Sequence, residues 1–351
     1  MNRIDKVFSF TFTLLAVALL QSCTDGPKKP DISNIKVKLG MIRFEKDFFQ
    51  IDTTNLDNEM EKLREKHHDF LGDFTYKILG LENTDTSKWG FVIKRFYADY
   101  KPIYDSTQKF DKEVNEARNK LEESLRYVKY YFPKYDAPEQ FITFIAPMDA
   151  FAYSETGGSG EILTRHGIGA GLQLHLGGQS MIYQSEAGLQ LYPEYISRKF
   201  NVVEIPSNAM RVVIDDIYPP IKQGGTLLDI LVDHGKRMYL LDLFMPDEKE
   251  EIKYGYTAVQ LEAMKENEGF VWNYFTENNL LFENDLLKIR SFVNDGPSTA
   301  EFGLGSPGFV SLFVGKKMIE AYMNRNPKTT VQELLSTDAK KILSGSAYKP
   351  R

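Results

Sequence analysis

The sequence has few of the groups that enzymes commonly use for covalent chemistry. It contains a single cysteine, Cys23, in 351 residues, so no disulfide can form within the chain. No serine stands in a G-x-S-x-G turn, the nucleophile motif of α/β-hydrolases. The five histidines include no pair four residues apart, so the H-E-x-x-H helix of zinc peptidases is missing. The sequence therefore lacks the usual signatures of a hydrolase.

A surplus of basic charge is also missing. The formal net charge is -6, and both signs are mixed along the chain. Proteins that bind nucleic acid usually show a basic surplus, so we expect no nucleic-acid partner. Hydrophobic residues make up 42% and aromatic residues 13%, which is enough for a sizeable core.

Long apolar runs are limited to one stretch near the N-terminus. Arg3 and Lys6 give a basic start to residues 7–20, a run of apolar and hydroxyl residues too short to span a bilayer comfortably. The run leads into "LQSC", which ends at Cys23 and resembles a bacterial lipobox, where the thiol receives a diacylglycerol. We expect a lipoprotein signal peptide over residues 1–22 and lipid attachment at Cys23. The alternative is an ordinary secretory signal that happens to contain a cysteine.

The segment after the signal is expected to be a tether. Residues 23–34 include "TDGPKKPDI", whose glycine, prolines and lysines are typical of a linker. No later segment approaches eighteen apolar residues. We therefore expect a single domain over residues 35–351, attached to the membrane by its lipid.

Periodicity divides this domain into an early sheet and a helical second half. Strands are expected at the start of 35–49 and over 140–148, 161–164 and 171–176. Helices are expected over 55–81, 106–132, 193–200, 206–217, 226–244, 257–278, 307–325 and 330–343. Their expected N-caps include Ser207, Thr257 and Ser306. The outline predicts an α+β fold with a small antiparallel sheet in the N-terminal half.

The helix expected over 226–244 carries a histidine on an apolar face. The residues that share this face are Leu227, Leu231, His234, Met238 and Leu241. Gly235 costs a helix about 1 kcal/mol relative to alanine, and it allows another backbone to come close. An unpaired buried imidazole nitrogen costs about 1–3 kcal/mol, so we expect His234 to be neutral and hydrogen-bonded to a neighbouring group. A ligand-binding or proton-handling role for His234 is the alternative.

Other candidate motifs favour structural roles. The glycines of residues 167–171 fit neither a Rossmann nor a P-loop spacing. Asp215-Asp216 is a carboxylate pair of the kind common at solvated helix ends, and the aromatic stripe of residues 253–282 is typical of a core. The remaining histidines, which show no ligand spacing but could still meet in space, are His67, His68, His166 and His175.

Several longer segments, taken in order, resemble the gliding-motility lipoprotein GldB family of Bacteroidota. They include "IRFEKDFFQID" (42–52), "GIGAGLQLHLG" (167–177), "YPEYISRKF" (192–200), "LLDILVDHGKRMYLLDLFMP" (227–246) and "SPGFVSLFVGKKMIEAYMNRNP" (306–327). The most specific segments are N-E-x-x-x-W-x-Y-F, which starts at Asn267, and the tail "SGSAYKPR" (344–351). The resemblance covers nearly all of the chain after the signal.

That family is in turn similar to predicted zinc peptidases. In those proteins an H-E-x-x-H helix precedes a T-L-L-D-x-x-x-x-E-G helix, whose glutamate would be the third metal ligand. Here His234 stands where that glutamate would, and the preceding residues 205–218 contain no histidine. The resemblance thus implies a zincin-like scaffold with no metal site, no catalytic residue and no cofactor. Candidate residues for a relic groove are His234, Asp233, Arg237, Tyr239 and Asp242.

The resemblance also implies a function. It indicates a non-catalytic cell-envelope lipoprotein of the gliding and associated secretion machinery, which acts by binding or assembly through a pseudo-peptidase scaffold. Its implied partners are the membrane, through the lipid, and envelope proteins of that apparatus. Residues 24–29 carry no acidic run of the kind associated with surface export, so we expect the periplasmic face of the outer membrane. A divergent metal-dependent peptidase or other hydrolase is the alternative.

Overall fold

The computed structural model describes residues 29–81, 85–152, 159–165, 167–220 and 224–350. The predicted signal peptide, Cys23 and His166 lie outside these described residues. By its contacts the chain divides after Pro30, and residues 31–351 make one unit. None of the helices in the described ranges is both long enough and apolar enough to cross a bilayer.

A four-stranded sheet lies in the N-terminal half of this unit. Its strands are β1 (Gly40–Arg43), β2 (Gln140–Phe144), β3 (Glu161–Leu163) and β4 (Gly167–Gly171), in the order β1-β2-β4-β3. The α+β class is confirmed, but the sheet is mostly parallel rather than antiparallel, since only β3 and β4 pair antiparallel. A parallel pair needs a long crossover, and the helices between β1 and β2 supply one. Alternation within a strand carries no information on the direction of its neighbour.

The glycine-rich strand β4 runs through the interior of the sheet, between β2 and β3. The predicted strand over 171–176 is wrong, because residues 172–174 form a 3₁₀ turn after β4. A Cβ atom on Gly169 would lie 2.9 Å from Ile162 and 3.0 Å from Phe144. Glycine therefore makes room in β4 for larger side chains of the neighbouring strands.

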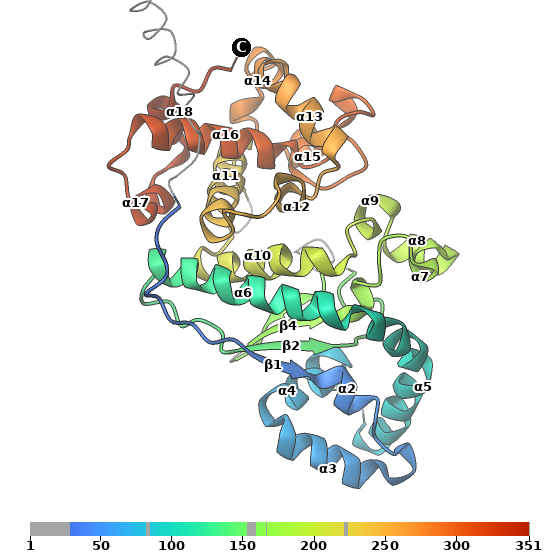
Figure 1. Cartoon of the computed structure of the whole chain (residues 1–351). Helices are drawn as coiled ribbons and strands as arrows, with labels where there is room; N and C mark the ends of the chain where they lie inside the picture. The colour runs from blue at the N-terminus through green and yellow to red at the C-terminus, as the bar shows by residue number, and fades with distance from the viewer. Residues whose placement is uncertain (1–28, 82–84, 153–158, 166, 221–223, 351) are drawn as a thin grey trace, which may run out of the picture. The chain divides into compact units, whose positions relative to one another are not determined.

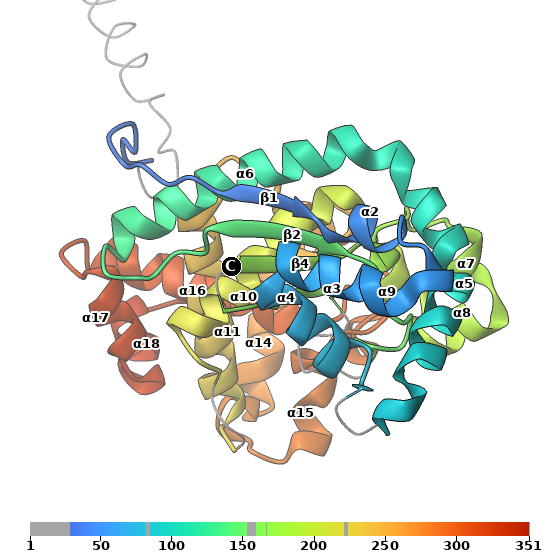
Figure 2. The same cartoon turned by 90° about the horizontal axis from the view of Figure 1, so that it is seen from below.

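Helices cover both faces of the sheet (Figures 1 and 2). On one face lie α6 (Asp111–Tyr131) and α10 (Ile205–Ile217), and on the other lie α2 (Phe44–Phe48), α3 (Leu56–Lys66) and α4 (His68–Gly72). The ring centroid of Phe70 in α4 is 4.9 Å from that of Phe44 in α2 and 5.5 Å from that of Phe144 in β2. Aromatic contacts therefore pack the helices of this second face against β2. Helix α5 (Trp89–Thr107), which the periodicity did not predict, leads from this group to α6.

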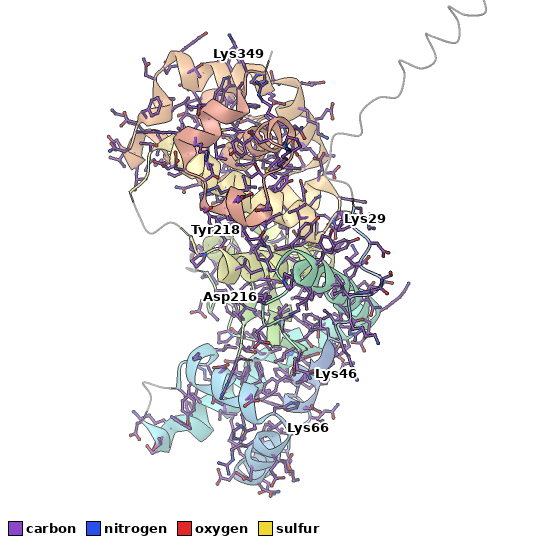
Figure 3. The ribbon with its side chains drawn as sticks, turned by 90° about the vertical axis from the view of Figure 1, so that its left-hand side faces the viewer. Lys29, Lys46, Lys66, Asp216, Tyr218 and Lys349 are labelled. Atoms are coloured by element: carbon purple, nitrogen blue, oxygen red, sulfur yellow. The ribbon has the colours of Figure 1, made fainter. Side chains whose placement is uncertain are left out.

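A further layer of helices packs on α10 from the side away from the sheet (Figure 3). At its centre α11 (Leu227–Phe244) crosses α16 (Val310–Arg325). Around them lie α12 (Glu250–Tyr254), α13 (Ala258–Glu266), α14 (Glu268–Glu277), α15 (Leu286–Val293), α17 (Val331–Ser336) and α18 (Ala339–Ser346). Three short helices, α7 (Met181–Gln184), α8 (Glu186–Leu191) and α9 (Glu194–Ser197), precede α10.

The two most family-specific segments of the sequence meet in this layer. The hydroxyl of Tyr348, in the C-terminal tail, donates a 2.7 Å hydrogen bond to Glu268 Oε1 at the start of α14. The Tyr348 ring also lies edge-on to Trp272, with the ring centroids 4.9 Å apart. Tail and helix therefore support each other.

Some predicted helix ends differ from the structure. Thr257 is an N-cap, with a capping box to Gln260, as predicted. Ser207 lies inside α10, because Pro206 occupies the first turn and moves the helix start to Ile205. Ser306 does not cap α16, since its hydroxyl bonds to the backbone of Thr299 and of Gly303.

Other predicted helices are divided or shortened. The segment 55–81 breaks at His67, and the segment 257–278 breaks at Asn267, where the backbone leaves helical geometry. The segment 330–343 divides into α17 and α18, and the segment 193–200 keeps only the short α9. Hydrophobic periodicity continues across such breaks because both pieces face the same core.

Candidate functional site

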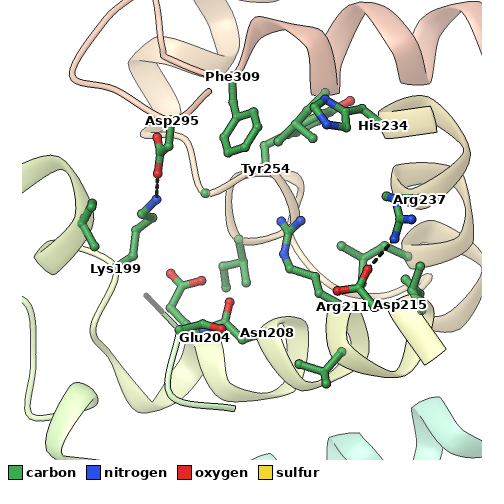
Figure 4. A pocket seen from close by; sticks show the side chains of 18 of the residues that line it. Lys199, Glu204, Asn208, Arg211, Asp215, His234, Arg237, Tyr254, Asp295 and Phe309 are labelled. Atoms are coloured by element: carbon green, nitrogen blue, oxygen red, sulfur yellow. Dashed lines mark hydrogen bonds and ion pairs between the residues drawn. The ribbon is translucent and has the colours of Figure 1, made fainter. Parts of the chain in front are cut away.

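A cavity of about 400 Å³ lies among α10, α11, α12 and the start of α16 (Figure 4). Its apolar lining comes from Ile196, Phe200, Val212, Ile214, Leu241, Ile252, Tyr254, Phe309 and Leu312. Its polar lining includes Lys199, Glu204, Asn208, Arg211, Asp215, His234, Arg237, Asn294 and Asp295. Volume and lining are those of a small-molecule or peptide-end pocket, apolar with a few convergent polar groups.

Helix α10 supplies one polar stripe of the cavity. Glu204, just before the helix, and then Asn208, Arg211 and Asp215 follow at spacings of four, three and four, which places them on one face. The opposite face of α10 is apolar and faces the sheet and α6, which fixes the direction of the polar stripe.

Helix α11 supplies the facing wall through His234 and Arg237. The Nδ1 atom of His234 lies 2.8 Å from the hydroxyl of Ser311, a buried residue of α16. Burial lowers the pKa of His234 to about 4, so the imidazole is neutral at pH 7. The expected hydrogen bond of His234 is thus confirmed, and the lowered pKa agrees with the expected neutral state.

The three donor nitrogens of Arg237 are all engaged. Its Nε donates to Asp233 at 2.8 Å, one terminal nitrogen donates to Asp215, and the other donates to the carbonyl of Tyr218 at 2.9 Å. This cation is therefore held in place by α10 and its own helix, and it is already charge-compensated.

A second ion pair closes another side of the cavity. Lys199 Nζ lies 2.5 Å from Asp295 Oδ2, which ties the segment after α9 to the segment after α15. Arg198 adds a hydrogen bond of 2.7 Å to the carbonyl of Gly255. These contacts join segments that are far apart in the sequence, so the cavity exists only in the folded chain.

Arg211 and Glu204 are compensated less completely. Arg211 donates to the carbonyl of Lys253, and no described carboxylate lies within ion-pair distance of its guanidinium. Burial lowers the pKa of Arg211 from its ordinary value. Burial raises the pKa of Glu204 to about 7, in spite of the attraction of Arg211 and Lys199. Figure 4 shows Arg211 rising from α10 toward Tyr254, with Glu204 and Asn208 nearby.

One wall residue has a strained backbone. Phe309 has a φ angle of 55°, in the left-handed region that non-glycine residues seldom adopt. Its N–H donates to Asn294 at 2.9 Å, and its carbonyl accepts from the Tyr256 hydroxyl at 2.8 Å. Its ring lies edge-on to His234, with 5.6 Å between centroids. Strain kept by surrounding bonds is a feature of functional sites, and here it fixes an aromatic ring at the cavity wall.

The five residues predicted for the groove separate into two groups. His234 and Arg237 line the cavity. Asp233 does not line it but forms an ion pair with Arg237. Tyr239 and Asp242 do not line it. Asp242 instead pairs with two buried lysines, Lys253 at 2.5 Å and Lys316 at 2.7 Å. Residues on one helix point in all directions, so proximity in sequence to His234 was an unreliable guide.

Sequence reasoning missed Glu204, Asn208 and Arg211. Their spacing of four and three, continued by Asp215 four residues further on, was the available signal, but a search restricted to histidine pairs does not detect it. Lys199 and Asp295 reach the cavity from separate segments, and no sequence pattern links them.

The described histidines do not converge. His67 is buried against Asp47 at 2.7 Å, whereas the neighbouring His68 is exposed. His175 pairs with the buried Glu161 at 2.8 Å. Among the described residues, no three histidine, cysteine, aspartate or glutamate side chains are grouped closely enough to hold a metal ion.

Comparison with known protein families gives a match that covers nearly the whole chain. The model of the family described as gliding motility protein GldB matches residues 25–350, nearly the whole chain. No curated protein and no solved structure matches the chain significantly.

Proposed function

This chain belongs to the GldB family of gliding motility proteins, and from that premise we propose that it is a non-catalytic lipoprotein of the cell envelope. In this proposal residues 1–22 are a signal peptide, Cys23 carries the lipid, residues 23–34 are a tether and residues 35–351 are the working domain. The domain acts by binding or assembly within the gliding and secretion apparatus, and the lipid holds it at the periplasmic face of the outer membrane.

The observation that carries the non-catalytic part is the set of side chains facing His234. Asn208 and Val212 lie four residues apart on α10 and line the same cavity as His234. A zincin would need histidines at two positions with this spacing, and zinc prefers nitrogen, sulfur and carboxylate ligands. A carboxamide and an isopropyl group do not fit that requirement. We therefore propose that the scaffold is a degenerate peptidase whose cavity serves binding.

The charges of the cavity support the same proposal. Lys199 and Arg237 are paired with carboxylates, and His234 is neutral because of its burial. Such groups shape and hold a pocket, but they offer no activated nucleophile.

One observation favours the hydrolase alternative. A carboxyl group with a pKa of about 7 in a cavity, such as that of Glu204, is suited to general acid–base catalysis. A peptide-cleavage assay on the purified protein separates the two functions. A cavity that only binds should leave peptides intact, whereas a catalytic Glu204 should cleave them in the wild type and lose that activity in a folded Glu204→Gln variant.

Crosslinking in the living cell tests the binding function. A photoreactive residue at Asn294, which is exposed and lines the cavity, should trap an envelope partner. The same residue at Lys112, an exposed position on α6, is the matched control. Equal crosslinks from both positions would contradict a specific surface at the cavity. About one zinc ion per chain in tag-free protein would contradict the non-catalytic proposal.

A further inference from the structure

In the described part of the chain, the ion pairs of the cavity leave the cation of Arg211 without a carboxylate partner. Lys199 is matched by Asp295, and Arg237 by Asp215 and Asp233. Arg211 has only the carbonyl of Lys253 as a hydrogen-bond acceptor among the described residues. A half-buried guanidinium gains from an anion, because water can solvate it only in part.

The geometry of this cation favours a carboxylate. A guanidinium presents its N–H groups as a planar fork that fits the two oxygens of a carboxylate. A phosphate carries about -1.5 to -2 charge at pH 7, and it would face Glu204, Asp215 and Asp295 in the same cavity. A singly charged carboxylate meets less repulsion from these groups.

The acceptor groups beside Arg211 favour a ligand that carries a hydrogen-bond donor next to its anion. Glu204 and Asn208 both line the cavity, and Glu204 has no described ion pair. A ligand with an N–H group close to its carboxylate can satisfy Arg211 and Glu204 together. The aromatic wall of Phe309 and Tyr254, with Leu241, offers a surface for an apolar side chain.

We propose that this cavity receives an α-carboxylate with an adjacent N–H group and an apolar side chain, that is, the carboxyl-terminal residue of a peptide or a free amino acid. The carboxylate pairs with Arg211, the N–H group faces Glu204, and the side chain lies against Phe309. This inference rests on the proposed binding function and names the ligand class for it.

Calorimetry on the lipidated full chain in detergent micelles tests the inference. The probes are acetyl-Leu-Leu with a free carboxylate, the same dipeptide as its carboxyl-terminal amide, free leucine and inorganic phosphate. We expect the acid to bind at least about tenfold more tightly than the amide, since a charge-assisted hydrogen bond is lost. Tighter binding of the acetylated acid than of leucine identifies a peptide end, and the reverse identifies an amino acid.

Variants locate the site. Arg211→Met should weaken binding of the acid at least about tenfold, and Arg95→Met, which removes an exposed arginine of α5, should leave it unchanged. A melting curve shows whether Arg211→Met is folded, and the comparison of acid with amide on the wild-type chain needs no variant. Equal affinity for acid and amide, or a phosphate that competes as well as the acid, would overturn the inference.

The proposed function fails in a different way. If the acid binds no more tightly than the amide but Asn294 still crosslinks a partner, only the proposed ligand class is wrong and the binding function stands. Cleavage of the acetylated dipeptide, visible by mass spectrometry and absent in Glu204→Gln, would overturn the non-catalytic function instead.

Discussion

Gly235 in α11 and Gly315 in α16 lie in backbone contact where the two helices cross. A Cβ atom on Gly235 would lie 2.2 Å from the carbonyl oxygen of Gly315, and one on Gly315 would lie 1.9 Å from the carbonyl oxygen of Leu231. The close approach brings Ser311 within hydrogen-bond distance of His234. The expected role of Gly235, to admit another backbone, is confirmed.

Gly235→Ala should therefore destabilise the protein, although alanine is the better helix former. The methyl group must push two helix backbones apart, and overpacking of this kind costs about 1–3 kcal/mol or more. Gly72→Ala is the control, because nothing lies within 4 Å of its Cβ position. Chemical denaturation should show a lower free energy of unfolding for Gly235→Ala only. An equally stable Gly235→Ala protein would show that the crossing can relax.

Asp242→Asn should be among the most damaging conservative changes. Its carboxylate contacts Lys253 and Lys316, both buried. Burial alone would lower the pKa of Lys316, but Asp242 and Glu320 raise it above its ordinary value. Removing the charge leaves two buried ammonium groups without their common partner, at a cost of about 3–5 kcal/mol. Asp105→Asn, at an exposed pair with Lys101, should cost about 0–1 kcal/mol. Similar melting temperatures for the two variants would refute this account.

The cavity residues Glu204 and His234 should give pH dependences of opposite sign. Burial raises the pKa of Glu204 from 4.5 to about 7, so the folded state holds more protons there than the unfolded state, and stability falls as pH rises through that window. Burial lowers the pKa of His234 from 6.5 to about 4, so the unfolded state holds more protons, and stability is lost as pH falls through that window.

Substitution by glutamine should separate these two contributions. Relative to wild type, Glu204→Gln should gain stability as pH rises, and His234→Gln should lose it, each by on the order of 1–3 kcal/mol between about pH 4 and about pH 8. Denaturation at several pH values measures both slopes. Slopes of the same sign would mean that burial does not control these groups. A fully stable His234→Gln protein that fails in complementation would assign this residue a working role.

Tyr348 should contribute to stability from the end of the chain. Tyr348→Phe keeps the contact with Trp272 but loses the hydrogen bond to Glu268, which is worth about 0.5–1.5 kcal/mol, or more if the carboxylate becomes unpaired. Tyr130→Phe, at a half-exposed tyrosine of α6, is the control and should change little. Thermal melting of the two variants tests whether the tail supports α14. A destabilisation of equal size in both variants would contradict a stabilising role for the Tyr348–Glu268 hydrogen bond.

Cys23→Ser should abolish lipid attachment. Two acyl chains bury many methylene groups at about 0.8 kcal/mol each, which makes anchoring stable. The variant should lose labelling by fatty acid and leave the detergent phase on partitioning. Continued labelling of the serine variant would show that the lipobox interpretation is wrong.

The sequence by itself determined the family, the α+β class and the main helices. The order and spacing of segments such as residues 227–246 are enough to identify the family. Amphipathic periodicity is enough to predict α6, α10 and α11. The Thr257 cap and the hydrogen-bonded His234 also follow from local rules, since a helix start and a buried imidazole each need a partner.

Only the tertiary structure decided the direction of the strands and the membership of the cavity. Parallel pairing of β1 with β2 depends on a crossover of many helices, which no pattern within a strand records. Lys199 meets Asp295 across 96 positions of sequence, and Tyr348 meets Glu268 across 80. Asp242, eight residues from His234, lies on another side of α11 and outside the cavity lining, because a helix turns about 100° per residue. Local sequence determines where each helix forms and which of its faces is apolar. The packing of α10, α11 and α16 determines which of their side chains share a pocket.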